Sequence, residues 1–274
     1  MTLRTERYLK TSIAVLLTIP FIVPFLMLLS TSFRTFKDYV ANPGGFPASF
    51  TLNNLTNAWN GANLGGALIS TLITCAVACT VAAIAALAGA YWFRIHQGRF
   101  AVTLHWLLVA GWAIPTVAWL IPVFVILTQV GFTDSRIMTG VVDGVSSLPF
   151  ALYLLHTFFR QVLSTDILEA ATLDGAGVLL MFSRIAVPLA RPALAAVTAL
   201  VFVWTFGDLL VAATLLQDPS VNTLTLATAS LATRENLNLQ GQAAAGLVAL
   251  LPTLLVFAFA QRALQLGFGA GSGK

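Results

Sequence analysis

The chain has 274 residues, of which 58% are hydrophobic and only 9% are charged, and its formal net charge is +4. Soluble domains carry roughly a quarter charged residues, so this composition excludes an ordinary water-soluble protein and indicates that most of the chain contacts lipid. The basic residues stand at the ends of apolar segments and are not massed on one face, which argues against nucleic-acid binding.

Six apolar segments follow one another along the chain, and each has about the 20 residues that a helix needs to cross the hydrocarbon core. Backbone groups inside a bilayer must satisfy their own hydrogen bonds, so these segments are expected to be helices. We therefore predict an all-α integral membrane protein that forms a single transmembrane domain over residues 1–274. Its spans are expected at approximately 11–33, 66–93, 100–128, 137–160, 193–216 and 242–263.

The first apolar segment follows a short basic stretch that contains Arg4, Arg7 and Lys10. Such a stretch is also typical of a secretory signal peptide. The segment is too long for the apolar region of a signal peptide, however, and no convincing cleavage site of small residues precedes Arg34. We therefore expect a signal anchor that is retained.

The lysines and arginines predict which side of the membrane each loop faces, because cytoplasmic loops are enriched in basic residues. With the N-terminus in the cytoplasm, ten of the fourteen basic residues lie inside and four lie outside. We therefore expect both termini and the 161–192 loop in the cytoplasm. The turn-rich 34–65 and 217–241 loops then face the exterior.

Cysteine and histidine residues suggest no chemistry by their spacing. Cys75 and Cys79 lie four residues apart, which places them on one helical face in a geometry unsuited to a mutual disulfide. We expect them to be ordinary core residues. His96, His105 and His156 form no metal-ligand spacing, and no metal site is expected.

Two carboxylates within the apolar segments are candidates for a substrate pathway. An ionisable group inside a span costs at least a few kcal/mol unless it is paired or hydrated. We therefore expect Asp208 to face a translocation cavity or a partner subunit, with a structural hydrogen bond to a neighbouring helix as the alternative. Asp143, near the outer end of the fourth segment, raises the same question.

Trp112, Trp119 and Trp204 are the aromatic candidates for the same pathway. Indole faces can cover the apolar C–H surfaces of a sugar, while carboxylates accept hydrogen bonds from its hydroxyl groups. The alternative for each tryptophan is a position facing lipid or the membrane interface, where this residue is enriched.

A cluster of charged residues, glycines and prolines interrupts the apolar pattern between the fourth and fifth segments. The pattern predicts a short helix (LEAATL), a glycine-relaxed turn and a second helix closed by prolines, all facing water. The residues concerned are Glu169, Asp174, Gly175, Gly177, Arg184, Pro188, Arg191 and Pro192.

This cluster resembles the EAA loop of ABC-importer permeases, in which Glu-Ala-Ala is followed at fixed spacing by Asp-Gly-Ala, a Phe, Pro-Leu and a further Pro. So many positions in fixed spacing are far more specific than a three-residue motif. The matching residues are Glu169, Ala170, Ala171, Asp174, Gly175, Ala176, Phe182, Pro188, Leu189 and Pro192.

The resemblance implies a type I ABC-importer permease fold with six transmembrane helices, in which the EAA loop forms a cytoplasmic coupling helix seated in a groove of an ATPase. Glu169 would then pair with a basic ATPase residue, Asp174 would cap the second helix, and Gly175 would permit the turn. The family also implies a second homologous permease, two ATPase subunits and an external substrate-binding protein, which would dock on the outer loops of a bacterial cytoplasmic membrane protein.

Further stretches resemble the MalG-like carbohydrate permeases, among them Ile121-Pro122-Val123, Leu251-Pro252 and Gln261-Arg262. In comparable tails the chain end reaches the ATPase, which makes Gly271 and Lys274 candidates for the same contact. One departure is Phe206-Gly207-Asp208, where many relatives have Trp-Asn followed by an acid.

The C-terminal GFGAGSGK superficially suggests a phosphate-binding loop. A Walker A motif, however, requires glycine at the position that Phe268 occupies here. We therefore expect this chain to be no enzyme and to bind no cofactor, with ATP and Mg²⁺ held by the partner ATPase subunits.

The sequence thus predicts the permease subunit of an importer for a sugar or related carbohydrate. The same fold carrying glycerol-3-phosphate or another polyol derivative is the alternative. A secondary transporter would show inverted repeats and intramembrane ion sites, and an intramembrane enzyme would need a paired His/Asp or Ser/Lys constellation, which the sequence lacks.

Overall fold

The computed structural model describes residues 3–231 and 238–269, and every regular element in these ranges is helical. The α-helices are α1 (Leu3–Ser32), α2 (Phe36–Ala41), α3 (Asn53–Gly61), α4 (Leu64–Ile95), α5 (Arg99–Ala110), α6 (Thr116–Gln129), α7 (Arg136–Val162), α8 (Thr165–Leu173), α9 (Val178–Met181), α10 (Val187–Gly207), α11 (Leu210–Leu215), α12 (Leu224–Ser230) and α13 (Leu239–Gly269). Two 3₁₀ turns, η1 (Gly111–Ala113) and η3 (Pro219–Val221), and one π-helical turn, η2 (Phe182–Ala186), connect them.

Within the described ranges, five helical stretches are long and apolar enough to cross a membrane, and a sixth results if the bent pair α5–η1 and α6 counts as one span. The all-α architecture predicted from the sequence is therefore confirmed. The five stretches are Lys10–Ser32, Leu64–Ile95, Arg136–Val162, Val178–Gly207 and Leu239–Ala258.

The third apolar segment is not the single helix predicted over 100–128. It breaks after η1, and α6 turns away from the preceding helix by 94°. Ile114 at the break is extended, with ψ of 119°, because the residue before a proline is disfavoured in the helical region and Pro115 follows it. Hydropathy does not report this break, since the chain on both sides of it is apolar.

The fifth segment differs from the predicted 193–216 at both ends. Its helix runs without interruption from Val178 through η2, so Pro188 and Pro192 lie inside a span and do not close a second helix. In the π turn the Val187 N–H bonds the Phe182 carbonyl, a wider spacing that suits the missing donor of Pro188. At the other end α10 stops at Gly207, and a separate helix, α11, follows.

The chain forms two compact units, each described by itself: Met1–Gly65 with Ala227–Leu251, and Gly66–Leu226 with Pro252–Lys274. In the first unit the fully buried Arg34 guanidinium holds the 34–54 loop together. It bonds the carboxylate of Asp38 at 3.2 Å and the carbonyls of Gly45 and Asn42. The hydrogen bond from Arg34 also lowers the pKa of Asp38 from its ordinary value.

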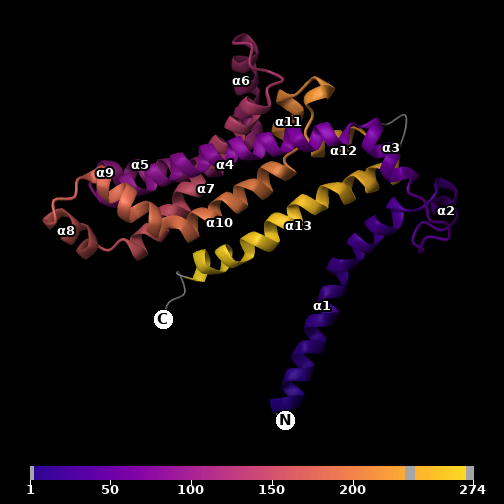
Figure 1. The fold of residues 1–274 in the computed structure, drawn as a ribbon, viewed down its shortest axis with the longest axis horizontal. Helices are drawn as coiled ribbons and strands as arrows, with labels where there is room; N and C mark the ends of the chain where they lie inside the picture. Colours follow the sequence, from indigo (N-terminus) through magenta and orange to yellow (C-terminus); the bar gives the residue numbers. More distant parts are fainter. Residues whose placement is uncertain (1–2, 232–237, 270–274) are drawn as a thin grey trace. The chain divides into compact units, whose positions relative to one another are not determined.

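In the second unit α4, α7 and α10 run side by side, with α8 at one end and α6 projecting sideways from the bundle (Figure 1). Gly140 and Gly144 of α7 make this approach possible, because a Cβ on either would lie within 3 Å of a backbone oxygen of α4. Cys75 and Cys79 both point their Sγ atoms at carbonyls of α10, so their predicted position on one helical face is confirmed.

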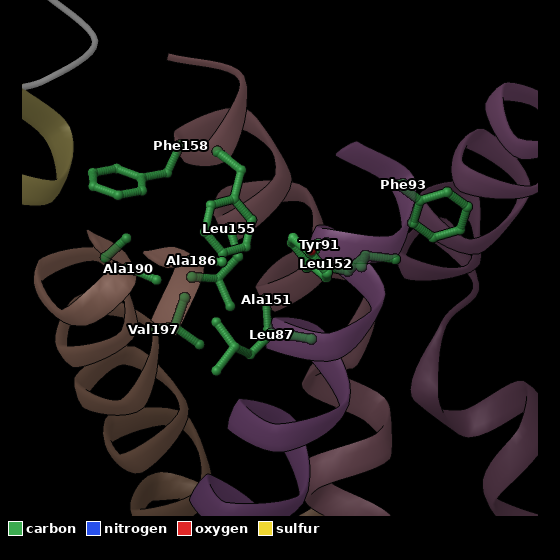
Figure 2. Packing of buried hydrophobic residues seen from close by; sticks show 14 of the residues in the cluster. Leu87, Tyr91, Phe93, Ala151, Leu152, Leu155, Phe158, Ala186, Ala190 and Val197 are labelled. Atoms are coloured by element: carbon green, nitrogen blue, oxygen red, sulfur yellow. The ribbon is translucent and has the colours of Figure 1, made fainter. Parts of the chain in front are cut away.

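The core of the second unit combines alanine, aliphatic and aromatic side chains, which come mainly from α4, α7 and α10 and from the adjoining η2. Figure 2 shows Leu87 of α4, Leu155 of α7 and Val197 of α10 converging, with Ala186 and Ala190 closing the gap. Each fully buried aliphatic side chain of this size is worth about 1.5–3 kcal/mol in water, but between lipid-embedded helices close packing replaces that driving force. The alanines permit such packing because they let the backbones approach.

Candidate functional site: the EAA segment and an indole-lined cavity

The EAA segment, residues 164–182, begins with a well-capped short helix. The hydroxyl of Ser164 accepts the N–H of Ile167 at the start of α8, and Asp166 in the first turn complements the helix dipole. Ala171 is buried against the membrane helices, whereas Glu169 and Ala170 are exposed. Glu169 is thus free to meet a partner.

The turn after α8 is a Schellman motif centred on Gly175. Gly175 has φ of +79°, its N–H bonds the Thr172 carbonyl at 3.0 Å, and the N–H of Ala176 bonds the Ala171 carbonyl at 2.9 Å. The prediction that this glycine permits the turn is confirmed. The predicted capping role of Asp174 is wrong, because the N-cap residue of α9 is Gly177, which offers no side chain, and Asp174 is instead the C-cap residue of α8.

Apolar side chains project from the EAA segment into open space. Leu173 is 88% exposed and Leu179 is 82% exposed. Leu173 is the last residue of α8 and Leu179 lies in the first turn of the Val178–Gly207 helix, so the two leucines flank the glycine-rich turn. Exposed leucines beside an acidic residue form a surface suited to an apolar groove with a basic rim.

The far side of the segment is fixed to the membrane helices by Tyr91 of α4. Its hydroxyl donates to the Val178 carbonyl at 3.0 Å, and its ring lies 5.2 Å from that of Phe182. Phe182, predicted as part of the motif, is therefore half-buried in the core, and Pro188 follows in the first turn of α10. Tyr91 was not predicted as a site residue, since no neighbouring motif in the sequence marks it.

A cavity of about 760 Å³ lies where α5, η1, α6, α7 and α10 meet. Trp112, Trp119 and Trp204, which were proposed separately as pathway residues, all line it. Thr116, Ser146 and Ser147, which carry hydroxyl groups, belong to the same lining. We call it the indole cavity.

Phe150, an aromatic residue that was not selected from the sequence, packs between two tryptophans of the indole cavity without lining the cavity itself. The Phe150 ring lies 5.2 Å from Trp112 and 4.8 Å from Trp204, so the three rings form a row from η1 through α7 to α10. No local signal singles out Phe150, because it lies within a long apolar helix.

Neither Asp143 nor Asp208 belongs to the cavity lining. The carboxylate of Asp208 accepts the N–H groups of Val211 at 2.8 Å and Ala212 at 3.3 Å, and so caps α11. Asp143 is buried on α7, within electrostatic range of Asp208 and Cys75. Asp208 lies at the break between α10 and α11, and its carboxylate makes structural hydrogen bonds to the following helix. This arrangement corresponds to the structural alternative that was considered from the sequence.

The tail residues Gly271 and Lys274 lie outside the described residues. Across the described ranges, no three His, Cys, Asp or Glu side chains gather as a metal site would require.

Comparisons with known proteins agree with this geometry. The melibiose/raffinose/stachyose import permease protein MelC of Bacillus subtilis strain 168 is 28% identical over 252 residues, which cover 92% of this chain and 91% of the relative. The diacetylchitobiose uptake system permease protein NgcG of Streptomyces coelicolor is 29% identical over 256 residues, covering 92% and 83%.

The fold is also that of a solved bacterial ABC transporter involved in the import of the acidic polysaccharide alginate. One chain of that structure superposes with a TM-score of 0.77 at 20% sequence identity, covering 96% of this chain and 98% of the other. Residues 80–268 match the family described as binding-protein-dependent transport system inner membrane component. The chain therefore belongs to this family, as a multi-pass membrane permease component of a binding-protein-dependent transport system.

Proposed function

We propose that this chain is a permease subunit of an ATP-driven importer of a neutral carbohydrate. The names of its relatives MelC and NgcG point to sugar import. The observation that carries the substrate class is the indole cavity, which combines aromatic faces and hydroxyl groups with a lining that holds no charged side chain. Sugars need this combination, since their rings present both C–H faces and hydroxyls.

The uncharged lining favours a neutral saccharide over glycerol-3-phosphate. A phosphate brought into an apolar cavity without a cation would keep the full cost of its desolvation. Lys, Arg and His are all absent from the cavity lining, which lies within the described residues. The alternative substrate is therefore the less favoured of the two.

The EAA segment supports coupling to an ATPase. Burying an exposed leucine such as Leu173 in a partner groove would be worth about 1.5–3 kcal/mol, and Glu169 beside it would supply a charge contact. The proposed assembly contains a second homologous permease, two ATPase subunits that hold ATP and Mg²⁺, and an external binding protein. Both chain termini and α8 lie on the cytoplasmic side in this proposal, as the basic residues indicate.

The helical run from Val178 to Gly207 gives this coupling a mechanical route. A displacement of α8 passes through the turn to α9 and η2, and these continue as α10, which carries Trp204 on the cavity wall. The Tyr91 hydrogen bond to Val178 makes α4 move with the same segment. Motion driven by the ATPase would thus reach the substrate cavity through one continuous helix.

Transport by the assembled importer in lipid vesicles tests this function. Vesicles containing both permeases and the ATPases, supplied with the binding protein and ATP, should accumulate a labelled neutral di- or oligosaccharide that the binding protein recognises. Glycerol-3-phosphate should be neither bound nor accumulated. Accumulation of glycerol-3-phosphate in place of every neutral sugar tested would overturn the proposed substrate class.

A further inference from the structure

A second cavity of about 800 Å³ lies at the other ends of α5 and α7, where α4 ends, α5 begins and α7 ends. We call it the basic cavity. Its lining contains Arg94, Arg160, His105 and His156, together with the amide side chains of Gln97 and Gln161, and no acidic side chain. The geometry points to a site for the phosphodiester headgroup of an acidic phospholipid.

The cationic groups of this cavity are held in place, yet they retain free donors. Arg94 is only 6% exposed, and its Nε donates to the Leu163 carbonyl at 2.8 Å, which ties α4 to the end of α7. In the described part of the chain its terminal nitrogens have no hydrogen-bond partner, and neither does the guanidinium of the exposed Arg160. A phosphate oxygen between them would accept from both arginines.

The two histidines line the same cavity, and His105 contributes a buried ring nitrogen that can donate or accept a hydrogen bond. His105 is 5% exposed, and its Nδ1 has no hydrogen-bond partner among the described residues. The His105 and His156 rings lie 4.2 Å apart, and both Arg94 and Arg160 are within electrostatic range of His156. This cluster concentrates positive potential and unused polar groups, which is the chemistry that recognises an anion.

The surroundings favour a lipid over a free phosphate as the source of that anion. Val102 and Trp106 of α5 line the cavity with exposed side chains, Trp106 being 57% exposed, and Tyr153 of α7 is exposed beside them. Apolar and aromatic side chains at the end of membrane-spanning helices lie where headgroups meet acyl chains. A glycerophospholipid would fill both parts, with its phosphate at the arginines and a chain along Val102 and Trp106. Under the proposed orientation the lipid belongs to the cytoplasmic leaflet.

Retention of lipid by the purified importer tests this site. The full complex would be taken from nanodiscs of phosphatidylcholine mixed with phosphatidylglycerol, and the lipids that remain bound would be identified by native mass spectrometry. We expect phosphatidylglycerol to be retained over phosphatidylcholine. Arg160→Gln should lower its retention about fivefold, the effect of one cation near an anionic lipid, and Gln161→Glu should also lower it, because it adds one negative charge to the cavity lining.

Arg99→Gln is the matched control, because Arg99 is an exposed arginine at the start of α5 that does not line the cavity. It should retain phosphatidylglycerol like the wild type. A further arm adds inorganic phosphate, which should not displace the lipid. Equal retention by wild type, Arg160→Gln and Gln161→Glu would overturn the site, as would equal retention of phosphatidylcholine or displacement by phosphate. Protection of a cysteine at Trp106 by the second permease would also overturn it, since protein would then cover the cavity.

Lipid retention is measured without transport, so it fails or succeeds independently of the proposed sugar import. Arg160 and Gln161 are exposed, so their substitution should leave the fold intact. The intact mass of the complex in the same spectra checks that each variant still assembles.

Discussion

The EAA segment and the indole cavity contrast in how the chain builds them. The EAA segment is local: α8, its Schellman turn and α9 occupy one short stretch, and its outward side chains are exposed. The indole cavity is assembled from five elements, and its tryptophans stand far apart in the sequence. A local, exposed segment suits contact with a partner common to every transport cycle, whereas a composite cavity suits discrimination between substrates.

This contrast makes a functional prediction. Changes in the EAA segment should reduce ATP hydrolysis and uptake together for every substrate. Changes in the indole cavity should alter how uptake depends on the substrate, while docking of the ATPase is unchanged. Substitutions at four positions are taken from the largest expected effect to the smallest. Those of Glu169, Gly175 and Trp204 test this difference, and those of Asp208 test a residue that lies outside both regions.

Glu169→Lys should have the largest effect. It reverses an exposed charge of α8 that is proposed to face a basic ATPase residue, and disrupting one side of a close charge pair costs about 2–5 kcal/mol. Binding-protein-stimulated ATP hydrolysis and sugar uptake in vesicles should both be lost, with Glu169→Gln intermediate. An ATPase carrying the opposite charge swap should restore part of both activities; normal stimulated hydrolysis in the Lys variant would remove α8 from the coupling route.

Gly175→Ala should have the next largest effect, because an L-residue at φ of +79° is strained by about 1–2 kcal/mol. If the whole strain energy is lost from the free energy of docking, the affinity for the ATPase should drop about five- to thirtyfold. Gly177→Ala is the matched control, since Gly177 has φ of −71° and open space around its Cβ position. Equal affinities for the two alanine variants in a pull-down titration would show that the turn conformation is not needed for docking.

Substitutions of Asp208 separate its capping role from a role of its charge. Asn caps a helix about as well as Asp, whereas Ala costs about 0.5–2 kcal/mol. Asp208→Asn should therefore transport like the wild type, and Asp208→Ala should lower the thermal stability of the detergent-purified complex and its uptake. Impaired uptake by the Asn variant with unchanged melting would instead assign a transport role to the charge.

Trp204→Ala should have the smallest and most selective effect. Loss of one aromatic contact is worth about 0.5–1.5 kcal/mol, so half-maximal uptake should require about two- to tenfold more sugar-loaded binding protein. ATPase docking should be unchanged. Phe100→Ala, which removes an exposed ring that lines neither cavity, is the control and should leave uptake unaltered.

Much of the fold follows from the sequence, because lipid imposes a simple rule on apolar segments. Long apolar runs predict spanning helices, and the Asp-Gly-Ala-Gly pattern predicts the turn that Gly175 makes with positive φ. The breaks before Pro115 and after Gly207 escaped prediction, since apolar residues continue through both and hydropathy measures only their average.

Individual residues of the indole cavity could be predicted from the sequence, but their meeting in one cavity could not. Trp112, Trp119 and Trp204 were selected by residue type, but their convergence depends on the 94° bend and on how each helix is rotated. The partners Phe150, Tyr91 and the His105–His156 pair become visible only when α4, α5 and α7 are packed, because each belongs to an otherwise ordinary apolar helix.

The central claim, that α8 is the element through which the ATPase acts, is most directly tested by cross-linking at Leu173. A Leu173→Cys variant, made in a background with Cys75 and Cys79 replaced by alanine, would be assembled with the ATPase subunits and treated with a short thiol cross-linker. Phe46→Cys is the control, because Phe46 is as exposed as Leu173 and belongs to the 34–65 loop, which the basic residues predict on the exterior. The account predicts a cross-link from residue 173 to an ATPase subunit and none from residue 46. Labelling of residue 173 by an impermeant reagent from outside intact cells, with no cross-link to the ATPase, would contradict it.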